Sequence, residues 1–241
     1  FDGVTFKADY DKASVEWIDY GPDNYAGVTW SNTPHNRKVF LGWMSNWSYA
    51  TVVPTDRWRS AMTTPRDLSL VRTAQGLKIK SKVSPEFVNA GSEIVVRDQI
   101  IIQDSLLVNS LSAADLSLSF ISGVVDALNF SIEYVNTKGQ KVVLKFDKNL
   151  NQFSLDRELS GNVDFAPQFT RVANAPRHLR DDKIQFTLVA DVSSLEVFLD
   201  GGLTLMTMIY FPDEPLGDVV IKTETELQLE NLSVKTLKSI W

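Results

Sequence analysis

The side chains best suited to chemistry lie in the first 65 residues of this 241-residue chain. Five of its six tryptophans, at positions 17, 30, 43, 47 and 58, fall there, interleaved with tyrosines and short polar residues. An aromatic face stacks well on the C–H face of a sugar ring, and neighbouring polar groups then hydrogen-bond the sugar hydroxyls. Aromatic residues also fill hydrophobic cores, which is their usual role. Composition alone leaves both interpretations open.

Carboxylates and histidines are the other candidates for chemistry. By residue type, Asp19 and Asp23 resemble the acid–base pair that cleaves a glycosidic bond. There are only two histidines, His35 and His178, and no cysteine. These numbers do not favour a metal site or a Ser-His catalytic pair, so each histidine is interpreted as a loop or surface residue. We predict no metal ligands and no cofactor.

Short strands must position these side chains. Residues 142–146 and 195–199 are rich in β-branched and aromatic residues, and residues 232–237 alternate apolar with polar positions. Asn-Thr-Lys-Gly at 136–139 and Asp-Gly-Gly at 200–202 are typical of hairpin connections. No convincing amphipathic helix is present. The pattern predicts an all-β fold of the sandwich, barrel or propeller type.

Charge and hydropathy exclude some function classes. A net charge of -6 and a pI near 5.0 argue against a nucleic-acid partner, which requires a basic face. No apolar run approaches the roughly 20 residues that span a bilayer, so no membrane partner is predicted. The first residues are neither an initiator methionine nor a signal peptide. We therefore expect the chain to start inside a longer polypeptide.

Two separated groups of sequence words narrow the alternatives. The first group comprises Trp-Ile-Asp-Tyr-Gly-Pro-Asp-Asn-Tyr-Ala at 17–26, Phe-Leu-Gly-Trp-Met-Ser-Asn-Trp at 40–47 and Pro-Arg-Asp-Leu-Ser-Leu at 65–70. The second is Ala-Asp-Val-Ser-Ser-Leu-Glu-Val-Phe-Leu-Asp-Gly-Gly at 190–202. In this order and spacing they resemble the C-terminal portion of glycoside hydrolase family 32. That family comprises the invertases, inulinases, levanases and other fructan hydrolases.

The resemblance implies a five-bladed β-propeller that carries the active site, followed by a C-terminal antiparallel β-sandwich. On this basis we expect the last propeller blade at residues 1–65, a linker at 66–74 and the sandwich at 75–241.

The resemblance also implies a retaining mechanism with a nucleophilic Asp and a Glu that acts as acid and then base. The family carries these groups, and an acid that binds the fructosyl hydroxyls, in Asn-Asp-Pro, Glu-Cys-Pro and Arg-Asp-Pro words. This chain contains no Asp-Pro pair and no cysteine. We therefore expect no catalytic residue in it and no activity of the chain alone. The matching motif assigns Asp19 and Asp23 to structure.

Three substrate-binding residues follow from the resemblance. Trp43 matches a family tryptophan that lines the fructosyl subsite, and Tyr25 matches a tyrosine close to that pocket. Trp47 is a candidate for an outer sugar subsite, together with Tyr49. Asn24 stands where the family has Phe or Tyr, which predicts a more polar wall. The alternative for each aromatic residue is packing within the propeller.

The predicted function is that of the C-terminal part of a fructan hydrolase acting on levan, inulin or sucrose type substrates. Its partner is then a fructose-containing oligo- or polysaccharide, and its relatives imply an extracytoplasmic location. A lone blade exposes too much apolar surface, so we expect residues 1–65 to meet the missing N-terminal propeller portion, a second copy or the sandwich. The alternative function is a non-catalytic carbohydrate-binding or protein-association module.

Overall fold

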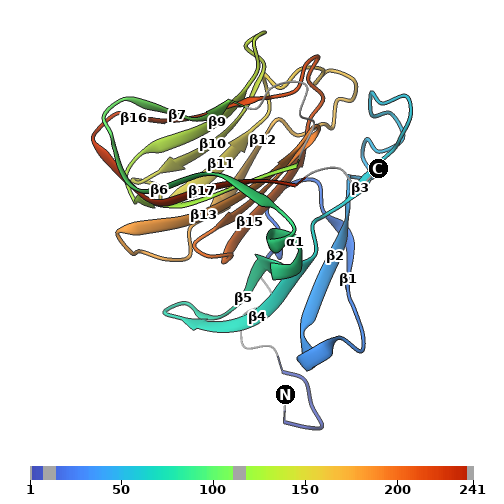
Figure 1. The fold of residues 1–241 in the computed structure, drawn as a ribbon. Helices are drawn as coiled ribbons and strands as arrows, with labels where there is room; N and C mark the ends of the chain where they lie inside the picture. Colours follow the sequence, from blue (N-terminus) through green and yellow to red (C-terminus); the bar gives the residue numbers. More distant parts are fainter. Residues whose placement is uncertain (1, 8–14, 111–117, 238–241) are drawn as a thin grey trace.

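A computed structural model describes residues 2–7, 15–110 and 118–237 of the chain (Figure 1). The described part is almost entirely β and forms three antiparallel sheets. Its helical elements are one turn of 3-10 helix (Pro34–Asn36) and helix α1 (Pro85–Asn89). Neither described helix has the length or the apolar character needed to cross a bilayer.

The first sheet, here called the blade sheet, has five strands in the order β1-β2-β4-β5, with β3 paired to β2. The strands are β1 (Tyr25–Thr29), β2 (Lys38–Met44), β3 (Ala61–Met62), β4 (Arg66–Thr73) and β5 (Gly76–Val83).

The linker predicted at 66–74 is not observed. These residues form β4, which pairs with β2 (Phe40 opposite Arg66) and along its whole length with β5. The blade sheet therefore continues to Val83. Turn signals around Pro65 suggested a boundary, but strand pairing with Phe40 depends on contacts across the fold that local sequence does not reveal.

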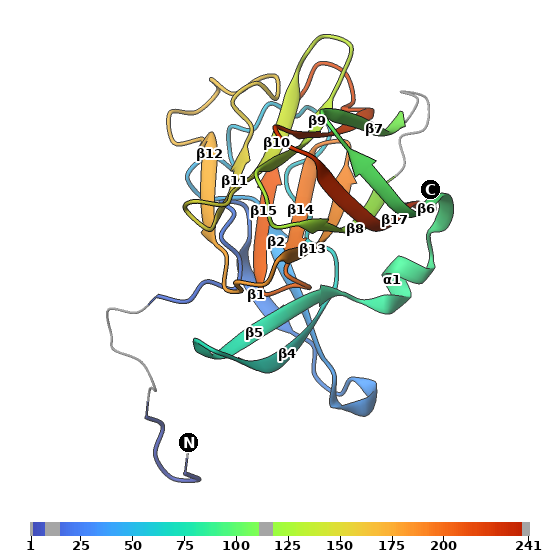
Figure 2. The same ribbon diagram turned by 90° about the vertical axis from the view of Figure 1, so that its left-hand side faces the viewer.

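The two remaining sheets have six strands each and pack face to face as a sandwich (Figure 2). The β13 sheet, in the order β15-β14-β13-β8-β17-β6, contains β6 (Ser92–Ile102), β8 (Leu118–Asp126), β13 (Lys183–Asp191), β14 (Ser194–Leu199), β15 (Thr204–Ile209) and β17 (Leu227–Leu237). The β10 sheet, in the order β12-β11-β10-β9-β16-β7, contains β7 (Ser105–Ser110), β9 (Phe130–Val135), β10 (Lys141–Asp147), β11 (Gln152–Asp156), β12 (Val172–Pro176) and β16 (Asp218–Thr223).

The sandwich core follows from the alternation of apolar residues. Leu144 of β10, Phe186 of β13 and Val234 of β17 are fully buried between the sheets. Strands β14 and β15 differ, because nearly all of their residues are buried. Their outer face is covered by the blade sheet, which lies against this part of the β13 sheet with α1 beside it (Figures 1 and 2).

Candidate functional site

The three predicted sugar-binding residues form one aromatic cluster. The ring centroids of Trp43 and Trp47 are 4.9 Å apart. Tyr25 meets both rings edge-on, at 6.2 Å from Trp43 and 6.5 Å from Trp47. Tyr25 is 54% exposed and Trp47 is 67% exposed, so the cluster is open to solvent.

Strand pairing explains why these rings meet. Tyr25 of β1 lies directly opposite Trp43 of β2, and side chains of opposite residues share one face of a sheet. A bulge follows Tyr25, where Ala26 adopts a positive φ of 49°. After β2 the chain turns sharply and brings Trp47 back over Trp43.

A pocket of about 440 Å³ adjoins the cluster, within the size range of small-molecule sites. Tyr25, Trp47 and Asn24 line it, together with Trp17 and Asn174 of the sandwich strand β12. Its wall is therefore part aromatic and part amide, a combination suited to a ligand with both C–H faces and hydroxyls.

Asn24 lies where the segment before β1 comes close to β2. Its amide donates to Asp19 Oδ2 at 3.0 Å, while its Oδ1 lies against Gly42. A Cβ at Gly42 would lie 2.0 Å from that oxygen, so a larger residue there would displace the Asn24 side chain. The polar wall predicted at position 24 is thus formed by a side chain that is held in place.

A buried ion cluster joins the two groups of sequence words described above. Arg66 of β4 has no exposed surface and contacts Asp19 Oδ2 at 3.0 Å and Glu196 Oε2 at 2.5 Å. Thr207 of β15 donates from its backbone and its hydroxyl to Asp19, and Thr64 donates to Glu196. The segment before β1 is therefore fixed to both β4 and the sandwich.

A second buried cluster lies around Asp23. Arg157, which follows β11, donates to Asp23 Oδ2 at 2.7 Å, and the Tyr49 hydroxyl donates to Asp23 Oδ1. The Arg157 guanidinium lies 3.4 Å from the centre of the Phe169 ring. Burial raises the pKa of the Asp23 carboxyl, while Arg157 and the hydrogen bonds oppose that rise. Burial also raises the pKa of Tyr49, which keeps its hydroxyl protonated as the donor.

These contacts bear on the sequence-based interpretation. Asp19 and Asp23 are structural, as their motif indicated, and Asp19 also orders a turn by accepting from the Gly21 amide at 2.9 Å. Tyr49 is buried against Asp23, so the suggestion that it contacts an outer sugar is wrong. Among the described residues lining the aromatic pocket, Asp19 is the single carboxylate, and it is held by Arg66.

Neither histidine lines the aromatic pocket. His35 is exposed in the 3-10 turn, and His178 contacts the Tyr20 hydroxyl at 3.3 Å. Burial lowers the pKa of His178. The described residues contain no group of three or more His, Cys, Asp or Glu arranged to hold a metal ion.

Comparison with known families accounts for both halves of the chain. Residues 70–236 match the model "Glycosyl hydrolases family 32 C terminal", and residues 1–81 match the "Glycosyl hydrolases family 32 N-terminal domain". The chain belongs to glycoside hydrolase family 32. The two matches overlap within β4 and β5, where the blade sheet continues past the predicted boundary.

Individual family 32 relatives agree in sequence and fold. A levanase of Bacillus subtilis (strain 168) is 31% identical over 249 residues, which cover 100% of this chain and 37% of the levanase. An extracellular exo-inulinase of Aspergillus niger is 28% identical, with 100% of this chain and 47% of the relative covered. The solved exo-inulinase from Aspergillus awamori has a TM-score of 0.81 at 25% identity, covering 100% of this chain and 49% of its own. The chain thus spans about half or less of the length of these family 32 proteins.

The comparisons also describe the architecture. Family 32 structures combine a propeller with a sandwich, so the blade sheet is a propeller blade and the two packed sheets are the sandwich. A beta-fructofuranosidase from Schwanniomyces occidentalis, solved with fructosyl-erythritol, supports this fold with a TM-score of 0.74 at 23% identity.

Sequence reasoning missed two residues that hold the site. Glu196 is an acid within the otherwise apolar strand Leu-Glu-Val-Phe, which was a detectable signal for a buried pair. Arg157 stands 134 positions from Asp23, and nothing in the local pattern indicated their contact.

Proposed function

We propose that this chain supplies one wall of the sugar-binding site of a retaining β-fructosidase that acts on fructose-containing oligo- or polysaccharides. The observation that carries the proposal is the open cluster of Tyr25, Trp43 and Trp47 beside a polar pocket. Family membership supports the reaction class, and relatives named levanase and exo-inulinase support the substrate class.

The catalytic carboxylates are proposed to come from polypeptide outside this chain. A retaining pair must lie about 5–5.5 Å apart across the scissile bond and be free to act. The carboxylates close to the cluster, Asp19 and Asp23, are committed to Arg66 and Arg157. We also propose an extracytoplasmic location, because several relatives are named extracellular exo-inulinases.

The open surface of the blade sheet supports a covering partner. Every residue of β1 is exposed, and β1 is the last strand of its sheet. Val28 is 63% exposed and Leu70 is 70% exposed. We propose that further propeller blades cover this surface, with self-association as the alternative that size-exclusion chromatography with mass measurement distinguishes.

Sugar binding is tested by calorimetric titration of the purified chain with short levan- and inulin-type oligosaccharides. We expect Trp43→Ala to weaken binding about tenfold, or about 1.4 kcal/mol, as for an aromatic contact residue. Trp30→Ala is the matched control, because Trp30 is 50% exposed and lies outside the cluster. Equal affinities of the two variants would contradict the assignment.

Catalysis is tested by incubating the chain with sucrose, inulin and levan and measuring released fructose. We expect no turnover from the chain alone, and an Asn-Asp-Pro word in the gene upstream of Phe1. Turnover at ordinary enzyme rates would sink the proposal. Sugar binding without such an upstream word would favour a non-catalytic carbohydrate-binding module.

A further inference from the structure

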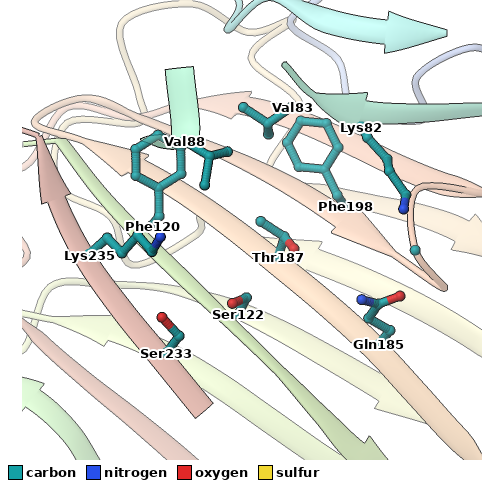
Figure 3. Close-up of a pocket in the computed structure, with 11 residues that line it drawn as sticks. Lys82, Val83, Val88, Phe120, Ser122, Gln185, Thr187, Phe198, Ser233 and Lys235 are labelled. Carbon is teal, nitrogen blue, oxygen red and sulfur yellow. The ribbon is translucent and has the colours of Figure 1, made fainter. Parts of the chain in front are cut away.

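A second pocket lies between the blade and the sandwich, and it shares no lining residue with the aromatic pocket (Figure 3). It holds about 180 Å³. Strand β5 and helix α1 form one wall and the outer face of the β13 sheet forms the other. Both walls come from described residues of this chain.

A row of small hydroxyl residues forms the floor of this pocket. Ser233 of β17 lies directly opposite Ser122 of β8, which in turn lies opposite Thr187 of β13. Because neighbouring strands are about 4.8 Å apart, the row extends about 10 Å across the sheet. The next row on the same face carries the large ring of Phe120, so the hydroxyl row is a trough beside a wall.

One end of the trough carries positive charge, and Asp67, which lies opposite Lys82 on β4, is paired with Arg37. Lys82 lines the pocket beside Gln185, and Lys80 lies two residues before it on β5. Lys80 Nζ and Gln185 Oε1 converge on Gly201, where a Cβ would lie 3.2 Å and 2.9 Å from them. Within the described residues neither Lys80 nor Lys82 has an ion pair. Burial and the neighbouring Lys82 lower the pKa of Lys80.

The backbone holds this end closed. The Ser81 amide, between the two lysines, donates to the Gly202 carbonyl at 2.8 Å. A Cβ at Gly202 would lie 1.9 Å from the Ser81 carbonyl oxygen, so β5 rests directly on the β14–β15 turn. The β5 backbone that carries the lysines is therefore fixed above the sheet by main-chain contact.

The chemistry of the lining favours an acceptor-rich, anionic ligand. The pocket has no carboxylate among its lining residues, although the chain as a whole has a net charge of -6. At the other end, the Lys235 ammonium lies 3.7 Å from the Glu93 carboxylate, which is a long ion pair. The Ser233 hydroxyl oxygen is buried and has no hydrogen-bond partner among the described residues, and leaving a buried hydroxyl unpaired is costly.

We propose that this trough is an anion site, in which a small oxyanion binds against Lys80 and Lys82 with Gln185 and Thr187 as further donors. The hydroxyl row that continues to Ser233 accommodates the body of a ligand that carries the oxyanion. The shared chemistry is a phosphate, sulfate or carboxylate group, either as a free ion or attached to a sugar.

The test is calorimetric titration of the purified chain with inorganic phosphate, sulfate and digalacturonate, a sugar-borne carboxylate. Sodium chloride at matched ionic strength and neutral fructose are the ligand controls. The site is supported if saturable binding weakens about tenfold or more in Lys80→Met/Lys82→Met, since hydrogen bonds to charged groups contribute about 1.5–3 kcal/mol. Lys145→Met, on the β10 sheet, is the control for loss of one surface charge and should bind normally.

Ser233→Ala distinguishes the two sources of the oxyanion. The substitution removes a hydroxyl that has no partner among the residues the structure describes, so we expect it to leave the fold intact. If digalacturonate binds more tightly than phosphate, and Ser233→Ala weakens its binding, the ligand is a sugar-borne anion. If phosphate binds more tightly than digalacturonate, and Ser233→Ala does not change its affinity, the ligand is a free ion. Binding no stronger than with chloride or fructose, or unchanged in the double lysine variant, overturns the site.

Discussion

The sandwich and the blade bury their residues in different ways. In the sandwich, Leu144 and Phe186 are fully enclosed between two six-stranded sheets. In the blade sheet, all of β1 is exposed and Leu70 is 70% exposed, while the buried residues gather on the side that meets the sandwich. The sandwich therefore has its own core, whereas the blade depends on the sandwich for its position.

The contacts between the two regions include buried ions as well as apolar groups. Arg66 and Arg157 have no exposed surface, and each binds a carboxylate in the segment that leads into β1. A buried charge requires a partner with good geometry, so such clusters specify a single arrangement more strongly than apolar contacts do. The aromatic cluster is placed by this arrangement, because Tyr25 lies only two residues after Asp23.

The largest expected effect comes from separating the two regions at Arg66. We expect Arg66→Met to lower the free energy of unfolding by about 3–5 kcal/mol, because Asp19 and Glu196 stay buried without a counter-charge. Tryptophan fluorescence reports mainly on the blade, since five of six tryptophans lie in the first 65 residues. In urea, the fluorescence transition should move to lower concentration than the circular-dichroism transition of the sandwich.

A matched control for this change is Arg37→Met. Arg37 pairs with Asp67 and Glu86 at the surface of the blade, with 29% of its side chain exposed. Surface pairs contribute about 0–1 kcal/mol, so we expect a small shift. Similar losses in both variants would show that burial of Arg66 does not determine the strength of the junction.

A substitution in the sandwich core tests the same comparison between the two regions. We expect Leu144→Ala to lower the free energy of unfolding by about 2–5 kcal/mol, because the residue is fully buried and leaves a cavity. Leu70→Ala makes the same chemical change in the blade and should have little effect. The measurement is urea unfolding followed by circular dichroism, and equal losses would contradict the assignment of the core to the sandwich.

The smallest effect is a pH dependence within the blade. A hydrogen bond from Arg37 lowers the pKa of Asp67 in the folded state. A carboxyl with a lowered pKa contributes stability above its unfolded value, about 3.9, and loses that contribution as the pH falls through the folded value. Below about pH 4 we expect wild type to lose up to about 1 kcal/mol more than Asp67→Asn, measured by fluorescence-monitored unfolding.

The fold was more predictable from sequence than the contacts that hold it. Enrichment in β-branched and aromatic residues identified strands such as β10, and the family motif predicted that Trp43 and Tyr25 lie close together, as their rings do. Local sequence patterns could not predict contacts such as that of Asp23 with Arg157, because such residues are far apart in the sequence and meet only when the sheets pack. The same limit explains why β4 was predicted to be a linker. Its first residues are polar, and only their pairing with β2 in the folded chain shows that they form a strand.

The Arg66–Glu196 contact also constrains how these regions can be recombined. A chimera that joins the blade of one family 32 protein to the sandwich of another takes Arg66 and Glu196 from different parents, because a junction just after β5 lies between them. A replacement at either position creates an unpaired ion inside the hybrid. Grafting should therefore treat Asp19, Arg66 and Glu196 as one inherited unit.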